Sequence, residues 1–170
     1  MTFIIAIQLN DSILVTADNK KVVLKETGEV QFDTSKSTKI HLWDQGIITG
    51  TGEIHVVTRS IEFFKKEADS DIEKLPQCLD ISRRIRELEI GKGYFQVENT
   101  RLLCSCYYEH GAQLYKIERF EPSEPYELIP IKPMDITVWM FNPNIDAISV
   151  DLQNLYIDLK DYAEFYNQEK

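Results

Sequence analysis

The sequence contains no apolar run that approaches the roughly 20 residues needed for a membrane-spanning helix. Its first residues, Met1–Ile5, also lack the basic segment and the small-residue cleavage site of a secretory signal peptide. Both absences argue against a membrane protein or an exported protein. We therefore expect a cytoplasmic location.

Positive charge is scarce, because 19 lysines and arginines oppose 28 acidic residues and give a formal net charge of −9. A nucleic-acid-binding surface needs a basic footprint, so nucleic acid is not an expected partner. The acidity fits simple solubility, and it equally fits a basic protein partner. The one basic cluster, at residues 83–86, is flanked by Asp80 and Glu87, which predicts an ion-paired helix face.

Metal-binding and redox patterns are also missing. The three cysteines are Cys78, Cys104 and Cys106. Cys104 and Cys106 are separated by one residue in a predicted strand, so their side chains should lie on the same face. This spacing suits neither a disulfide nor a zinc site. We interpret all three as buried apolar side chains in a reducing compartment. The histidines, at positions 41, 55 and 110, show no metal-ligand spacing, and we expect no metal or cofactor.

What the sequence does contain is a succession of short strands bounded by turn residues. In the first half, the predicted strands cover residues 2–8, 13–17, 21–24, 30–32, 39–43 and 47–49, with a turn at 26–29. In the second half, they cover residues 94–97, 101–108, 112–118 and 136–141, followed by a turn at 142–144. The proline-containing segment 120–133 is expected to be a loop or an edge strand.

Three other segments show the spacing of amphipathic helices. The first covers residues 53–67 and is marked by Ile54, Val57, Ile61 and Phe64. The second begins near Pro76, ends near Gly91 and is marked by Leu79, Ile81, Ile85 and Leu88. The third runs from Ile145 to the last residue, with six acidic residues against two lysines. Runs of strands alternating with runs of helices predict an α+β fold with antiparallel sheets. With no repeat or linker, residues 1–170 are expected to form one domain.

The first third of the chain carries a set of residues in a characteristic order. Thr2 opens the first strand, and Asp18 ends the second strand sixteen residues later. Lys39 precedes an aliphatic residue at the start of a later strand, and Gly52 ends the next one. This order resembles that of proteasome β-subunits and of the shorter bacterial protease subunit that partners a heat-shock unfoldase. The resemblance covers about residues 2–141 and implies an N-terminal-nucleophile (Ntn) hydrolase fold, an αββα sandwich of two antiparallel sheets, with a shortened C-terminal part.

The same resemblance implies a catalytic role for each member of the set. Thr2 would be the nucleophile, with its own free α-amine, of pKa about 8, as the base. Lys39 would favour the developing alkoxide as an ammonium, and Asp18 would orient it. Gly52 would donate its backbone N–H to the oxyanion. The substrate would be a peptide or another amide, and relatives of this kind assemble into rings or dimers.

Three features depart from the family pattern. The segment 142–144 replaces a Gly/Ser-rich turn, only a helix is predicted after Ile145 where the family adds two strands, and Met1 precedes Thr2. A retained Met1 would leave Thr2 with an amide in place of an amine, which removes the built-in base.

Two functions are therefore compatible with the sequence. The first is a threonine-nucleophile amide hydrolase or peptidase of the proteasome-like lineage, active or degenerate. The alternative is a catalytically silent Ntn-fold binding protein, such as an acidic immunity protein that neutralises a basic nuclease toxin. A ring-forming scaffold subunit like the proteasome α-type is a third interpretation. In the silent forms, Asp18 and Lys39 would be only an inherited ion pair.

Overall fold

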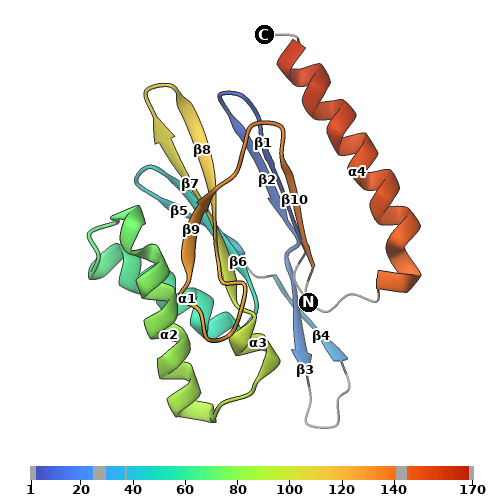
Figure 1. Ribbon diagram of the computed structural model, residues 1–170. Coiled ribbons are helices and arrows are strands. Elements are labelled where there is room, and N and C mark those ends of the chain that lie inside the picture. Colours follow the sequence, from blue (N-terminus) through green and yellow to red (C-terminus); the bar gives the residue numbers. More distant parts are fainter. Residues whose placement is uncertain (1–2, 25–29, 37, 141–144, 169–170) are drawn as a thin grey trace. The chain divides into compact units, whose positions relative to one another are not determined.

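The computed structural model describes residues 3–24, 30–36, 38–140 and 145–168 (Figure 1). Thr2, the turn predicted at 26–29 and the turn predicted at 142–144 lie outside these residues. The chain divides into two compact units, residues 1–37 with 132–170, and residues 38–131. Each unit is described by itself, and the single domain expected over residues 1–170 stays a prediction.

The first unit contains a three-stranded antiparallel sheet in the order β10-β1-β2. Its strands are β1 (Phe3–Gln8), β2 (Ile13–Ala17) and β10 (Ile136–Met140). Strand β1 lies at the centre, with Ile5 opposite Thr16 on one side and Val138 on the other. A separate two-stranded ribbon pairs β3 (Lys20–Leu24) with β4 (Val30–Lys36). All these strands agree with the sequence pattern to within a few residues at their ends.

The helix α4 (Ile145–Gln168) covers one face of the three-stranded sheet (Figure 1). Its residues Leu155, Leu159 and Ala163 pack with Ile5 and Ile7 of β1, because alternate strand residues point to the same face. Near the end of α4, the side chain of Asn167 accepts a hydrogen bond from the Asn10 amide at 3.5 Å, beside the β1–β2 turn. The sheet and the last turns of the helix are thus held together by both apolar packing and a polar contact.

The second unit is a five-stranded antiparallel sheet in the order β5-β6-β7-β8-β9. The strands are β5 (Ile40–Trp43), β6 (Gly46–Thr51), β7 (Arg101–Tyr108), β8 (Gly111–Glu118) and β9 (Glu127–Pro130). Strand β9 lies at the edge of the sheet, which agrees with the loop-or-edge prediction for residues 120–133, since prolines are tolerated there. The predicted α+β class with antiparallel sheets is confirmed.

Helices α1 (Ile54–Lys66) and α2 (Leu75–Ile90) share a single hydrophobic core with this sheet. Phe64 of α1 is fully buried and meets the indole of Trp43 edge to face, with ring centroids 5.1 Å apart. Cys78, Cys104 and Cys106 are free and buried in the same core, which confirms their predicted role as apolar side chains. Burial raises the pKa of the Cys104 thiol, so it stays uncharged at neutral pH.

Three details of the sequence interpretation are wrong. In α1, Ile54 is exposed and does not belong to the buried face that includes Val57, Ile61 and Phe64. Residues 94–97 are not a strand, because the short helix α3 (Phe95–Glu98) occupies this position. A run of four residues is too short for periodicity to separate helix from strand, and the helix is closed by the Thr100 hydroxyl, which donates to the Gln96 carbonyl at 2.7 Å. In α2, Ile81 and Leu88 are exposed, and Leu75, Cys78, Leu79 and Ser82 form the inward face instead. The 3-10 helix η1 (Ile72–Lys74) precedes α2.

Candidate functional site

Asp18 is anchored to the start of the first strand. Its carboxylate Oδ1 accepts a hydrogen bond from the Phe3 backbone N–H at 2.8 Å. Its own backbone N–H donates to the Phe3 carbonyl at 3.0 Å, which extends the β1–β2 ladder by one step. A half-buried carboxylate held in this way has a fixed direction, since two bonds to the same residue restrain both its backbone and its side chain.

Thr2, the predicted nucleophile, lies outside the described residues. The amide nitrogen of Phe3 nevertheless belongs to the peptide bond that joins these two residues. Asp18 is therefore hydrogen-bonded to the first amide that follows Thr2 in the chain. This bond places a member of the predicted catalytic set beside the residue that follows Thr2 in the chain.

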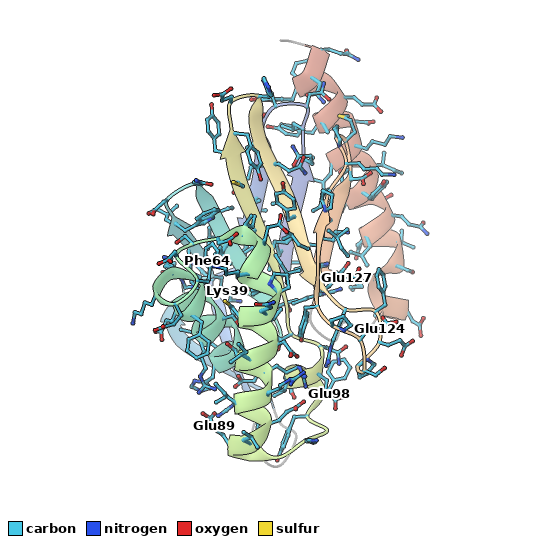
Figure 2. The ribbon with its side chains drawn as sticks, turned by 60° about the vertical axis from the view of Figure 1, so that its left-hand side comes forward. Lys39, Phe64, Glu89, Glu98, Glu124 and Glu127 are labelled. Carbon is cyan, nitrogen blue, oxygen red and sulfur yellow. The ribbon has the colours of Figure 1, made fainter. Side chains whose placement is uncertain are left out.

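Lys39 and Gly52 both belong to the second unit, where they flank the neighbouring strands β5 and β6. Lys39 is half-buried and immediately precedes β5 (Figure 2). The first residue of β5, Ile40, is paired with Thr49 of β6, and β6 then runs on through Thr51 to Gly52. The backbones of Lys39 and Gly52 thus lie at the same end of the β5–β6 hairpin.

Gly52 has a backbone conformation that only glycine adopts readily, with φ of 115°. A Cβ atom at this position would lie 2.5 Å from both Cα and Oγ1 of Thr100. The next residue, Glu53, donates its N–H to that same Thr100 Oγ1 at 3.0 Å and caps α1 by accepting from the Val56 N–H. Gly52 is therefore required by close packing, whether or not it also serves as an oxyanion donor.

Sequence reasoning missed two threonines beside this glycine. Thr49 and Thr51 lie on one face of β6, are almost fully buried, and their Oγ1 atoms have no hydrogen-bond partner within the part of the chain that the structure describes. Strand alternation predicts that they share a face, but it cannot reveal that their hydroxyls are unpaired. Buried hydroxyls without a partner are costly, so polar groups of this kind are candidates for contacts with a ligand.

The arginine cluster of α2 is mostly engaged with acidic neighbours. Arg83 contacts Asp80 at 2.8 Å and Glu87 at 2.5 Å, and Arg84 contacts Asp80 at 2.8 Å. Although burial opposes the charge, the bonds to Asp80 and Glu87 raise the pKa of Arg83 above its ordinary value. The predicted ion-paired face is confirmed, with Arg83 more buried than a solvated surface residue.

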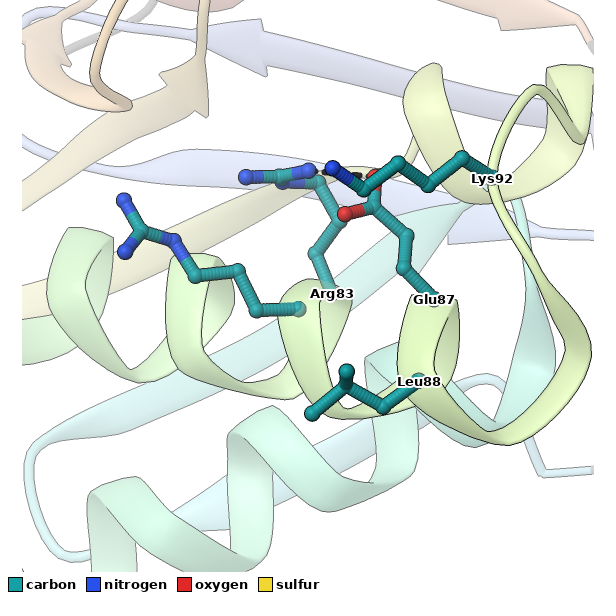
Figure 3. A pocket seen from close by; sticks show the side chains of 5 residues that line it. Arg83, Glu87, Leu88 and Lys92 are labelled. Atoms are coloured by element: carbon teal, nitrogen blue, oxygen red, sulfur yellow. Dashed lines mark hydrogen bonds and ion pairs between the residues drawn. The ribbon is translucent and has the colours of Figure 1, made fainter.

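A hollow of about 510 Å³ lies next to this cluster (Figure 3). Its lining consists of Arg83, Arg84, Glu87, Leu88 and Lys92. Arg83 is already committed to two carboxylates, so its positive charge is largely compensated before any ligand arrives. Arg83 itself therefore offers little electrostatic attraction for an anion in this hollow.

The described residues contain no group of three or more His, Cys, Asp or Glu side chains that could hold a metal ion. A search of the same residues finds no helix with both the length and the apolar character to cross a membrane.

Comparison with known proteins shows the fold of this chain. No protein-family model matches the sequence, and a search of curated proteins finds no match. Among solved structures, a Gly-1 mutant of Anbu from Hyphomicrobium sp. strain MC1 is similar, with a TM-score of 0.56 and 11% identity over 89% of this chain. Anbu from Yersinia bercovieri, described as an ancestral beta-subunit, gives a TM-score of 0.53 and 12% identity over 86% of this chain.

These Anbu structures have the proteasome-like Ntn fold, so the fold class predicted from the sequence is confirmed. The chain spans 64% and 63% of the lengths of those two proteins. At this level of identity the likeness concerns the fold and does not extend to any one family within it.

Proposed function

We propose that this chain is a threonine-nucleophile amide hydrolase of the proteasome-like lineage, with Thr2 as the nucleophile and a peptide or another amide as the substrate. The observation that carries the proposal is the 2.8 Å bond between the Asp18 carboxylate and the amide of Phe3. It anchors an acid at the residue that follows the candidate nucleophile.

The reaction begins with proton transfer from the Thr2 hydroxyl to the free α-amine of the same residue, directly or through one water. The oxygen then attacks the amide carbonyl carbon, and the carbonyl oxygen becomes an oxyanion. Collapse of this intermediate breaks the C–N bond, and the leaving amine takes up the proton. Water next attacks the acyl-threonine ester, which releases the carboxylic acid and restores the hydroxyl.

Lys39 and Gly52 have supporting roles in this proposal. The Lys39 ammonium stabilises negative charge on the attacking oxygen, and the Gly52 N–H stabilises the oxyanion, where one donor can contribute about 3 kcal/mol. Their common location at one end of the β5–β6 hairpin supports a joint role.

The test is hydrolysis of a set of fluorogenic peptide amides by the full chain and by variants at position 2. We expect Thr2→Ala to lower the rate at least about 100-fold, because the attacking oxygen is lost. Thr2→Ser keeps a hydroxyl and should retain measurable turnover. Equal rates for the parent and Thr2→Ala would contradict the proposal, since the activity would then not depend on this hydroxyl.

A second candidate function is binding of a basic protein, with no catalysis, as in an acidic immunity protein that neutralises a toxin. The observation that favours it is the distribution of charge on α4, where five acidic residues accompany a single lysine within residues 145–168. Such an association should weaken steeply as salt is raised, because exposed charges are screened. A basic partner bound equally well at low and high salt would argue against it.

A further inference from the structure

The helix α4 carries two apolar stripes on opposite sides. The inner stripe packs on the three-stranded sheet and includes Leu155 and Leu159. The outer stripe consists of Val150, Ile157 and Phe165, whose side chains are 66%, 55% and 59% exposed. Ile157 lies two residues from both Leu155 and Leu159, which at 100° per residue places it on the far side of the helix.

The three residues of the outer stripe are spread over about four turns of the helix. Val150 and Ile157 are seven residues apart, and Ile157 and Phe165 are eight apart. At 100° per residue, Ile157 lies about 20° from Val150 and Phe165 about 80° from Ile157, so the three side chains share one side of the helix within a sector of about 80°. Single exposed apolar residues are common. Three of them on the same side of a helix that already buries its other face call for an explanation of their exposure.

Uncompensated negative charge accompanies this stripe. Asp158, Asp161 and Glu164 are exposed on the same part of the helix. No lysine or arginine among the described residues forms an ion pair with any of the three. The contrast with α2 is direct, because the arginines there are paired with carboxylates of their own unit.

We propose that the outer stripe of α4, formed by Val150, Ile157 and Phe165 with its flanking acids Asp158, Asp161 and Glu164, is a docking surface for a basic amphipathic polypeptide segment. Apolar side chains of that segment would cover the stripe, and its lysines or arginines would pair with the acids. Charge complementarity selects a basic occupant, since an acidic one would face like charges. The inference rests on the second candidate function and assigns a place to it.

The test uses the full chain labelled with ¹⁵N and a synthetic 18-residue amphipathic peptide of lysine and leucine as the probe. One control peptide has the same composition in an order without an apolar face, and another has glutamate in place of lysine. At low salt we expect the first peptide alone to bind. Its binding should shift the amide signals of Ile157 and Asp161 and leave those of α2 unchanged.

Matched variants separate this surface from nonspecific attraction. We expect Ile157→Ser and Asp161→Lys each to weaken binding by about 5-fold or more, which is the effect of a central contact in an interface. Leu88→Ser removes an 87% exposed leucine from α2, and Glu127→Lys reverses an exposed charge on β9 (Figure 2). Both controls should leave the affinity unchanged.

The outcomes distinguish this inference from the function on which it rests. Binding of the basic peptide with equal affinity by the parent and both α4 variants would overturn the docking surface while leaving a basic partner in place. No binding of the basic peptide at low salt would overturn both. Equal binding of the glutamate peptide would also overturn the inference, because charge would then play no part.

Discussion

Replacing Gly52 with alanine is expected to lower the free energy of unfolding by at least about 3 kcal/mol, and the variant should be largely unfolded if the parent is marginally stable. Two costs combine. An alanine at φ of 115° is strained by about 1–2 kcal/mol. Its Cβ would also lie 2.5 Å from the Cα of Thr100, and a backbone atom cannot move aside as the end of a long side chain can. Urea denaturation followed by circular dichroism measures the change.

Gly93 provides the control for this experiment. Its φ is 84°, so alanine is strained there too, but beyond its two chain neighbours no atom of the described residues lies within 4 Å of the added Cβ. Gly93→Ala should therefore cost only about 1 kcal/mol. If both variants lose the same stability, the close approach of Gly52 to Thr100 is not important. The comparison also matters for catalysis, because lost activity in Gly52→Ala would not by itself identify an oxyanion donor.

Phe64→Ala is expected to lower the free energy of unfolding by about 3–5 kcal/mol. Phe64 is fully buried at the centre of the core that joins α1 to the five-stranded sheet. Its removal leaves a cavity and also takes away the edge-to-face contact with Trp43 at 5.1 Å. In the parent, the Trp43 indole N–H donates to the Ser105 carbonyl at 3.0 Å, and we expect this bond to remain in the variant. A change in the fluorescence of Trp43 would then report the altered packing around its ring.

Phe165→Ala is the matched control, because it makes the same chemical change on the exposed outer stripe of α4. Its side chain is 59% exposed, so the free energy of unfolding should change by no more than about 0.5 kcal/mol. A large loss of stability in Phe165→Ala, or a small one in Phe64→Ala, would show that the core is wrongly assigned. The Phe165 variant has a second use, because it truncates one residue of the proposed docking surface.

Much of the architecture is predictable because local patterns and tertiary structure agree. The strand Phe3–Gln8 is rich in β-branched residues and is buried along almost its whole length, and the helical spacing of Val57, Ile61 and Phe64 matches a buried face of α1. The three cysteines behave as apolar side chains, as their isolation from other ligands indicates. In α1 the helical period extends over 13 residues, which is enough to distinguish a helix from a strand.

The failures have equally local causes. Helix α3 is one turn long, and its conformation is set by the Thr100 hydroxyl that donates to the Gln96 carbonyl rather than by a repeat of apolar residues. In α2, Leu88 follows a helical spacing yet is exposed, because Cys78 and Ser82 complete the inward face instead. A hydropathy pattern does not rank a small serine or cysteine above a leucine for burial.

The candidate site is only partly accessible to sequence reasoning. The spacing of Thr2 and Asp18 suggests a catalytic pair by resemblance, but only the structure shows that the Asp18 carboxylate bonds the Phe3 amide. The close packing of Gly52 on Thr100 joins residues far apart in sequence, and no local pattern encodes it. Only the structure likewise shows that the Thr49 and Thr51 hydroxyls have no hydrogen-bond partner among the described residues.

The most direct test of a nucleophilic Thr2 is the intact mass of the purified full-length protein before and after treatment with a peptide epoxyketone. We expect a chain that begins at Thr2 and gains the mass of one inhibitor, because a free amine and a neighbouring hydroxyl together close a ring with this reagent. The adduct should be absent from Thr2→Ala. A chain that lacks Met1 and still remains unmodified would contradict the proposed catalysis.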